Sequence, residues 1–176
     1  MGRRMRRVAV VACAVLGVGG LWLPRIVPMP RCVVFNPSES APRGWYWIEH
    51  LDRVSPRAGD YVLADLPSAP ATFAAQRGYL PAGVPLLKRV GAVSPDLVCT
   101  SGAQVSVNGV VIATIRQFDW RHRSMPVDVI CRPLAGAEVF LLSDTSAASF
   151  DSRYFGPIDR SSVIGVAHPL WTWGGR

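Results

Sequence analysis

The sequence predicts a mainly β domain, built from antiparallel strands, that follows one N-terminal transmembrane helix. Three observations lead to this prediction. A charge-free apolar run lies near the N-terminus, short runs rich in β-branched and aromatic residues recur between Gly and Pro turns after Pro30, and few segments show helical periodicity. The apolar fraction of 49% and the charged fraction of 18% are typical of a globular chain and argue against disorder.

The apolar run covers residues 8–23 and follows a cluster of four arginines. A membrane-spanning helix needs about 20 apolar residues, and Ile26 and Val27 extend this run toward that length. A cleaved secretory signal has a similar start, but no small-residue cleavage site follows. We therefore expect a cytoplasmic tip and retained anchor in residues 1–27 and an exported domain in residues 28–176, because positive charge stays on the cytoplasmic side.

Net charge and cysteine usage limit the function classes. Removing the four N-terminal arginines from the net charge of +7 leaves +3, and no later basic stripe interleaved with aromatics follows. We therefore expect no nucleic-acid partner. The four cysteines form no CxxC pair and lie near no histidine cluster, so we expect no metal and no cofactor. Outside the cytoplasm Cys99 and Cys131 are the pair to test first, with Cys32 left free, although spacing alone does not fix connectivity.

The expected strands are seven short runs that cover residues 31–35, 44–51, 60–66, 85–93, 104–113, 137–144 and 162–170. The clearest is residues 104–113, where two alternating halves are joined by Asn108-Gly109, a dipeptide that type I′ hairpin turns prefer. Residues 69–79 are either a short helix or a loop, and residues 118–126 form a polar excursion.

Two serines stand in the segment NPSESAPRGWYW, residues 36–47. Because the residue before a proline avoids the helical region, we expect an extended stretch that puts Ser38 and Ser40 on one face. One hydroxyl would attack a substrate while the other donates a hydrogen bond. The alternative is an ordinary Ser/Pro surface turn. The following aromatic run, residues 45–48, either dips into a membrane interface or fills the core.

A lysine lies within an apolar run that we expect to be a strand. On a strand, Leu86, Lys88 and Val90 share one face. If that face is buried, the pKa of the lysine falls and Lys88 becomes able to deprotonate a serine near neutral pH. In the alternative, Leu87 is the buried residue and Lys88 faces solvent.

The third polar segment covers residues 141–158 and contains Asp144, Asp151 and Arg153. An Asp-Arg pair is well suited to lock such a loop, because a guanidinium forms fixed, bidentate contacts with a carboxylate. Asp151 fits either that structural role or a role in chemistry.

Taken together, these motifs resemble the type I signal peptidase family. The resemblance rests on Ser40-Ala-Pro with Ser38 two residues before it, Lys88-Arg-Val about fifty residues later, and Ser-Asp-Thr followed by Ser-Phe-Asp-Ser-Arg-Tyr-Phe-Gly-Pro-Ile, and it covers nearly the whole chain. The pattern Asn-x-Ser-x-Ser-x-Pro-x-Gly-x-Tyr over residues 36–46 is similar to the TraF-like branch, the maturation peptidases of conjugative transfer systems. Ala41 stands where housekeeping signal peptidases have Met, and Ser-Asp-Thr replaces their Gly-Asp-Asn.

The resemblance implies a barrel-like, antiparallel signal-peptidase catalytic domain with a serine-lysine dyad. It makes Ser40 the nucleophile, Lys88 its general base, and the Ser40 N–H and Ser38 hydroxyl the donors to the oxyanion. Asp151 would orient Lys88 or pair with Arg153, and Asp144 and Arg153 would support the site.

The implied location is the periplasmic face of a bacterial inner membrane, with a single pass and a cytoplasmic N-terminus. The implied partner is a pilin-like or signal-peptide-bearing protein, and the resemblance also points to a coupling of maturation to pilin cyclisation. Two alternatives stay open: a general signal peptidase of narrow specificity and a catalytically silent assembly factor of a secretion system.

Overall fold

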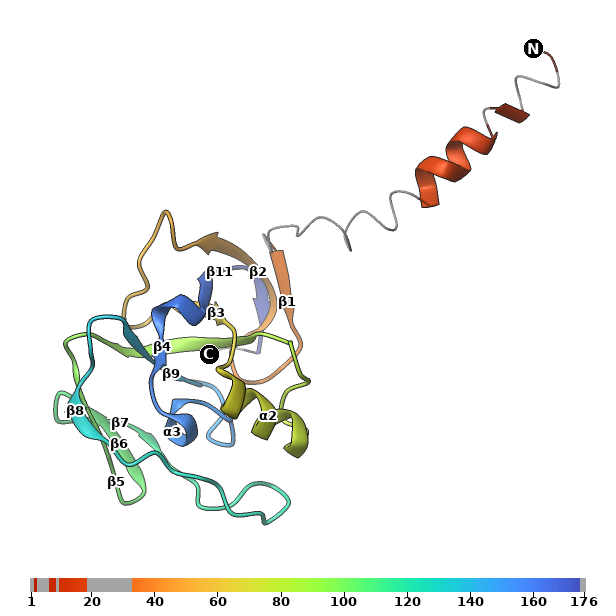
Figure 1. The fold of residues 1–176 in the computed structure, drawn as a ribbon. Helices are drawn as coiled ribbons and strands as arrows, with labels where there is room; N and C mark the ends of the chain where they lie inside the picture. The colour runs from red at the N-terminus through yellow and green to blue at the C-terminus, as the bar shows by residue number, and fades with distance from the viewer. Residues whose placement is uncertain (1, 3–6, 9, 19–32, 175–176) are drawn as a thin grey trace. The chain divides into compact units, whose positions relative to one another are not determined.

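The computed structural model describes residues 2, 7, 8, 10–18 and 33–174, and the chain divides into two units, Met1–Arg31 and Cys32–Arg176 (Figure 1). In the first unit residues 7, 8 and 10–18 are helical. Within the described residues we find no helix with the length and apolar character that a membrane crossing requires. Much of the expected anchor, including residues 19–27, lies outside the described residues, so the transmembrane helix stays a prediction.

The second unit is mainly β and antiparallel, as the sequence predicts (Figure 1). Within the described residues its larger sheet has seven strands in the order β1-β2-β11-β3-β4-β9-β10. In the described part of the chain β1 and β10 are free edges, so the sheet is open rather than a closed barrel. The strands are β1 (Val33–Asn36), β2 (Arg43–His50), β3 (Tyr61–Ala64), β4 (Leu86–Val93), β9 (Glu138–Leu142), β10 (Ile158–Asp159) and β11 (Val163–Trp173).

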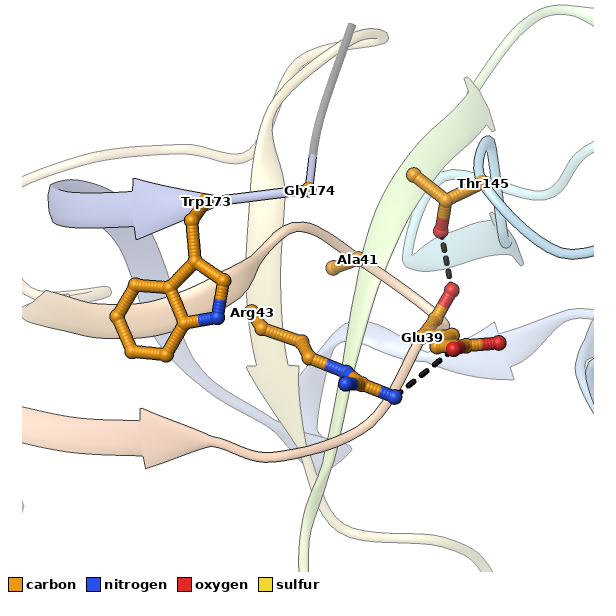
Figure 2. A pocket seen from close by; sticks show the side chains of 6 residues that line it. All are labelled: Glu39, Ala41, Arg43, Thr145, Trp173 and Gly174. Atoms are coloured by element: carbon orange, nitrogen blue, oxygen red, sulfur yellow. Dashed lines mark hydrogen bonds and ion pairs between the residues drawn. The ribbon is translucent and has the colours of Figure 1, made fainter.

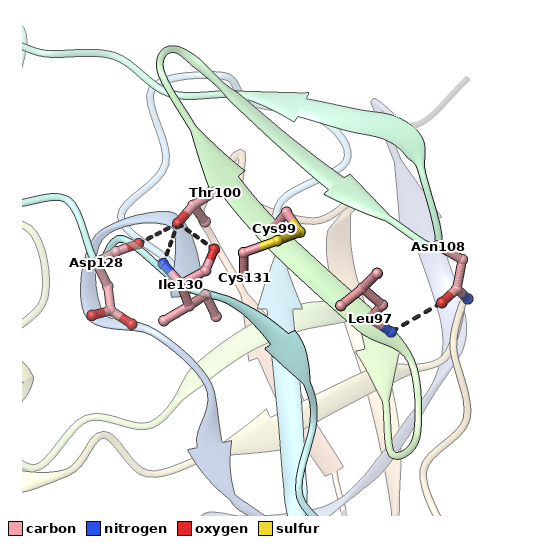
Figure 3. The surroundings of a disulfide bond; sticks show 7 residues. All are labelled: Leu97, Cys99, Thr100, Asn108, Asp128, Ile130 and Cys131. Atoms are coloured by element: carbon pink, nitrogen blue, oxygen red, sulfur yellow. Dashed lines mark hydrogen bonds between the residues drawn. A yellow bond between two sulfur atoms is a disulfide. The ribbon is translucent and has the colours of Figure 1, made fainter.

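The smaller sheet has four antiparallel strands in the order β7-β6-β5-β8: β5 (Leu97–Ser101), β6 (Gln104–Val107), β7 (Val110–Thr114) and β8 (Cys131–Pro133). The predicted hairpin is confirmed. Asn108 and Gly109 both have positive φ, 51° and 83°, as a type I′ turn requires. The Asn108 side chain also accepts a hydrogen bond from the Leu97 N–H at 2.9 Å, which ties the turn to β5 (Figure 3).

A disulfide joins Cys99 of β5 to Cys131 of β8, where the two residues are directly paired across the strands (Figure 3). This pairing confirms the expectation for these two cysteines. Cys32 lies outside the described residues, and Cys13 is a free, exposed thiol. The disulfide fastens the short strand β8 to the rest of the small sheet.

Short helices complete the fold. The segment expected to be a helix or a loop contains the helix α2 (Ser68–Arg77), which ends at Gly78 in the left-handed conformation common at helix C-termini. The helix α3 (Ser152–Phe155) begins after Asp151, whose side chain accepts a hydrogen bond from the Arg153 N–H. A single 3₁₀ turn, η1 (Arg160–Ser162), precedes β11.

β2 explains the two interpretations of the aromatic run. Alternate residues of a strand point to opposite faces. Tyr46 and Ile48 are buried in the core, whereas Trp45 and Trp47 are 46% and 43% exposed. The core interpretation is therefore confirmed for Tyr46 and Ile48, whereas the membrane-interface interpretation of the exposed Trp45 and Trp47 stays a prediction.

A glycine lets β2 begin close to β11. Gly44 has a φ of 144°, and a Cβ there would lie 2.1 Å from the Trp171 carbonyl oxygen. No other residue fits this close approach without movement of the backbone. Gly44 therefore helps fix the start of β2, and with it the end of the turn that carries Ser40.

Candidate active site

The first motif places its two serines on a turn. Residues 38–41 form this turn between β1 and β2, so the expectation of an extended stretch is wrong for them. The reason is Asn36, whose Nδ2 donates to three carbonyl oxygens of residues 38–42 at 3.1 to 3.2 Å and so closes the turn. The hydroxyls still meet as predicted, because the Oγ atoms of Ser38 and Ser40 lie 2.8 Å apart.

Ser40 lies against β4. Its Oγ donates to the carbonyl oxygen of Leu87, the residue before Lys88, at 3.3 Å. In the part of the chain that the structure describes, the Ser40 N–H makes no hydrogen bond. A free backbone N–H next to a hydroxyl is the kind of donor that stabilises negative charge on a substrate oxygen.

Lys88 is buried, with only 4% of its surface exposed, so the alternative in which it faces solvent is wrong. Burial lowers its pKa from 10.5 to about 8; the charge of Asp151 opposes this shift and that of Arg153 adds to it. The Nζ atom donates to the hydroxyl of Ser149, itself buried. A lysine in this state is a candidate general base.

Ser40 lies on the turn between β1 and β2 and contacts the backbone of β4 next to Lys88, which lies within that strand. Among the described residues they share no direct hydrogen bond, since Ser40 Oγ bonds to the carbonyl of Leu87 while Lys88 Nζ bonds to Ser149. In enzymes without substrate, catalytic hydrogen bonds are often long or unformed and tighten when the substrate binds. The missing hydrogen bond therefore does not rule out proton transfer between them.

The segment after β9 holds the nucleophile turn from the other side. Ser143 Oγ donates to the carbonyl oxygen of Ser40 at 2.8 Å, and Thr145 Oγ1 donates to that of Glu39 (Figure 2). These bonds connect residues more than 100 positions apart in the chain. Residues 143–149 therefore contact both parts of the site. Ser149 binds Lys88, and Ser143 and Thr145 bind the turn that carries Ser40.

Asp151 and Arg153 form a buried ion pair, with 0% and 2% of their surfaces exposed. Arg153 Nε and one terminal nitrogen each lie 2.7 Å from a carboxylate oxygen of Asp151. Asp151 also accepts a hydrogen bond from the Ser143 N–H at 3.0 Å. Burial alone would lower the pKa of Arg153, but the hydrogen bonds and charge of Asp151 outweigh it and raise that pKa. The geometry matches the loop-locking role, and Asp151 acts on Lys88 through its charge.

Asp144 ties the same segment to the larger sheet. Its carboxylate accepts a hydrogen bond from the Tyr61 hydroxyl at 2.8 Å and lies 3.6 Å from Arg89. Burial and the nearby Asp144 raise the pKa of Tyr61 above its ordinary value, so the phenol stays protonated and keeps donating. Asp144 therefore contacts supporting side chains rather than Ser40 or Lys88.

A cavity of about 200 Å³ opens beside the nucleophile (Figure 2). Arg43 and Glu39 form an exposed ion pair at 2.8 Å on its wall. Glu39 and Ala41 flank Ser40 in the chain, so the cavity lies next to the turn that carries the nucleophile. The lining residues are Glu39, Ala41, Arg43, Thr145, Trp173 and Gly174.

The sequence did not assign a role to three residues that contact this site. Ser149, Ser143 and Thr145 were visible only as members of the third polar segment, without roles of their own. One signal was available for Ser149, since it begins the Ser-Phe-Asp-Ser-Arg motif. No local pattern identifies the partners of the other two, because both partners are backbone carbonyls of a distant turn.

The family model described as signal peptidase, peptidase S26, matches residues 4–173 of the chain. The Plasmid transfer protein TraF of Escherichia coli is 35% identical over 191 aligned residues, which cover 98% of this chain and all of that protein. The Conjugal transfer protein TraF of Agrobacterium fabrum is 33% identical over 174 residues, 90% of this chain and 94% of that protein.

Among solved structures, a signal peptidase I from Enterococcus faecalis V583 aligns with a TM-score of 0.39 and 21% sequence identity. The alignment covers 64% of this chain and 97% of the other.

Proposed function

We propose that this chain, which belongs to the signal peptidase, peptidase S26 family, is a serine endopeptidase with Ser40 as nucleophile and Lys88 as general base. The observation that carries the proposal is the environment of Lys88. The lysine is buried, its pKa is lowered to about 8, and it directly follows the residue whose carbonyl accepts the Ser40 hydroxyl. With this pKa, Lys88 is neutral in about a tenth of the molecules at pH 7, compared with less than about a thousandth for an ordinary lysine.

The proposed reaction has two stages. Ser40 Oγ attacks the scissile carbonyl carbon while neutral Lys88 accepts the hydroxyl proton, and the C–N bond then breaks as the resulting ammonium protonates the leaving amine. In the second stage neutral Lys88 removes a proton from a water molecule, or from an amine, that attacks the acyl carbon. The ester bond to Ser40 Oγ then breaks, and the Lys88 ammonium returns the proton to that oxygen. The Ser40 N–H and the Ser38 hydroxyl would donate to the oxyanion in both stages.

We place this activity at the outer face of a bacterial inner membrane, with residues 1–27 as the anchor. A cluster of exposed apolar side chains on β1, β2 and β11 supports the proposal. Trp and Tyr are favoured at membrane interfaces, and four of these side chains are tryptophans, two on β2, which follows the turn of Ser40, and two on β11, which pairs with β2. The cluster consists of Val33, Phe35, Trp45, Trp47, Leu170, Trp171 and Trp173.

The proposed substrate is a pilin-like exported protein. The supporting observation is the similarity over nearly the whole chain to proteins named for plasmid and conjugal transfer. An amine that is part of the substrate can reach the acyl-enzyme at an effective concentration of about 10⁵ M or more. At that concentration attack by the amine competes with attack by water. The enzyme would then join the new end of the pilin to its own N-terminus.

A Ser40→Ala variant tests the proposal in the host. The uncut substrate should accumulate, while a Ser161→Ala variant, which alters an exposed serine far along the chain, should process normally.

Mass spectrometry of the mature product distinguishes hydrolysis of the acyl-enzyme from cyclisation. A product lighter by one water than the linear peptide, and without a free N-terminus, supports cyclisation. Normal processing by the Ser40→Ala variant would refute the assignment, and accumulation of many secreted precursors would identify a general signal peptidase.

A further inference from the structure

Side chains hold every carbonyl group of the turn that carries the nucleophile. The carbonyl oxygens of residues 38–42 all accept hydrogen bonds from side-chain donors, and Asn36 supplies three of these bonds. The two remaining carbonyls are those of Glu39 and Ser40, which lie on either side of the Ser40 α-carbon. The third polar segment holds both of them, so the backbone at the nucleophile is oriented by residues more than 100 positions away.

We infer that Thr145 is a positioning residue that aims the Ser40 N–H at the oxyanion. Thr145 Oγ1 donates to the carbonyl oxygen of Glu39. That carbonyl and the Ser40 N–H belong to one planar, trans peptide group, in which C=O and N–H point in opposite directions. A hydroxyl that fixes the carbonyl therefore also fixes the direction of the N–H.

The state of that N–H supports the inference. Within the described residues the Ser40 N–H has no hydrogen-bond partner, so nothing but the carbonyl side of its peptide group holds it in place. An oxyanion donor contributes most when its direction is set before the charge develops. Without the Thr145 hydroxyl the Glu39 carbonyl loses its side-chain hydrogen bond, and the direction of the Ser40 N–H is less tightly fixed.

Ser143 has a different effect on the same turn. Its hydroxyl holds the carbonyl of Ser40 itself, and that carbonyl shares a peptide group with the N–H of Ala41. The peptide group that contains the Ser40 N–H is thus oriented by Thr145. This distinction makes Thr145 the residue to test.

The inference rests on the proposed function, so its test must separate the two. We suggest acylation by p-nitrophenyl acetate, in which Ser40 Oγ bonds to the acetyl carbon, p-nitrophenolate leaves, and the hydroxyl proton passes to Lys88. The rate that disappears in Ser40→Ala is the Ser40-dependent rate. If the unaltered protein has no such rate, the proposed function fails and this inference falls with it.

Thr145→Val removes the hydroxyl and keeps the branched shape. The Ser40-dependent rate should fall about 10- to 100-fold, less than or equal to the loss of a whole oxyanion donor. Thr145→Ser, which keeps the hydroxyl, should stay within about threefold of the unaltered protein on the same argument. Thr72→Val is the matched control, since the Thr72 hydroxyl also donates to a backbone carbonyl, in α2, and its loss should not change the rate.

A pH profile separates positioning from general distortion. Ser149 lies in the same segment as Thr145 and holds Lys88, so a distorted segment would shift the acidic limb set by the lysine. In Thr145→Val we expect a slower reaction with an unmoved limb. An unchanged rate in that variant, a shifted limb, or a Thr145→Ser variant as slow as Thr145→Val would each overturn the inference.

Discussion

Lys88 of β4 and Arg153 of α3 are both buried cations, with 4% and 2% of their surfaces exposed, yet their surroundings differ in kind. Lys88 donates to the neutral hydroxyl of Ser149. Arg153 binds the carboxylate of Asp151 through two nitrogens and also donates to four backbone carbonyls. The pKa of the lysine is lowered and that of the arginine is raised.

The comparison shows that partners, rather than burial, decide whether a buried cation keeps its proton. Burial penalises both charges, but a carboxylate in contact reverses the penalty for Arg153. Among the residues that the structure describes, Lys88 contacts no carboxylate, and Asp151 affects its pKa only through longer-range charge. Ser149 joins the two environments, because its hydroxyl accepts from Lys88 while its carbonyl accepts from Arg153. The chain therefore places a cation suited to lose its proton beside one suited to keep it.

The largest expected effect comes from removing the lysine. If Lys88 is the general base that we propose, Lys88→Met should lower turnover by about 10⁴-fold or more, as the loss of the base does in serine peptidases. Lys88→Arg should be equally inactive, because a guanidinium stays protonated at working pH. A normal rate in the arginine variant would show that Lys88 is only a charge partner.

Lys88→Met should also stabilise the folded protein at pH 7. A pKa lowered from 10.5 to about 8 means that the buried ammonium destabilises the folded state at pH 7, by an amount of up to about 3 kcal/mol. The unfolded chain binds more protons between these two values, so stability of the unaltered protein should rise from pH 8 to 10.5. Denaturant midpoints measured across this range should show the rise, and Lys88→Met should lack it.

Breaking the other pair should have the opposite effect on stability. Asp151→Asn leaves the Arg153 charge buried without its partner, which typically costs about 3–5 kcal/mol. Turnover should fall together with the melting temperature, because the ion pair stabilises the segment after β9, which contacts both Lys88 and the turn of Ser40. Thermal melts and activity assays check this. A fall in turnover at an unchanged melting temperature would instead assign Asp151 to the orientation of Lys88.

The smallest expected effect is a shift in the pH profile. In the unaltered protein kcat/KM should decline below a pH of about 8, since the base must be neutral. Ser149→Ala removes the acceptor that favours the charged lysine, so the pKa and the acidic limb should move to lower pH, by about one unit for a hydrogen bond to a charged group. Ser146→Ala is the control, because within the described residues its hydroxyl makes no hydrogen bond. A limb that stays in place in Ser149→Ala would remove Ser149 from the control of Lys88.

The sequence by itself determined the parts of this protein that depend on local chemistry and on family resemblance. The Asn108-Gly109 hairpin follows from the backbone preferences of two residues, and most strands follow from the alternation of apolar side chains. The motifs around Ser40 and Lys88 identified the family, and the matches to the peptidase S26 model and to TraF proteins confirm that resemblance.

Only the tertiary structure decided how these parts act on one another. Pattern alone left Lys88 on either face of an apolar run, and the packing of β4 between β3 and β9 buried it. The turn at Ser40 was expected to be extended, but Asn36 and two hydroxyls from a segment more than 100 residues away hold it closed. Such contacts join side chains to backbone carbonyls, which every residue carries, so their partners leave no mark in the sequence and appear only when the chain is folded.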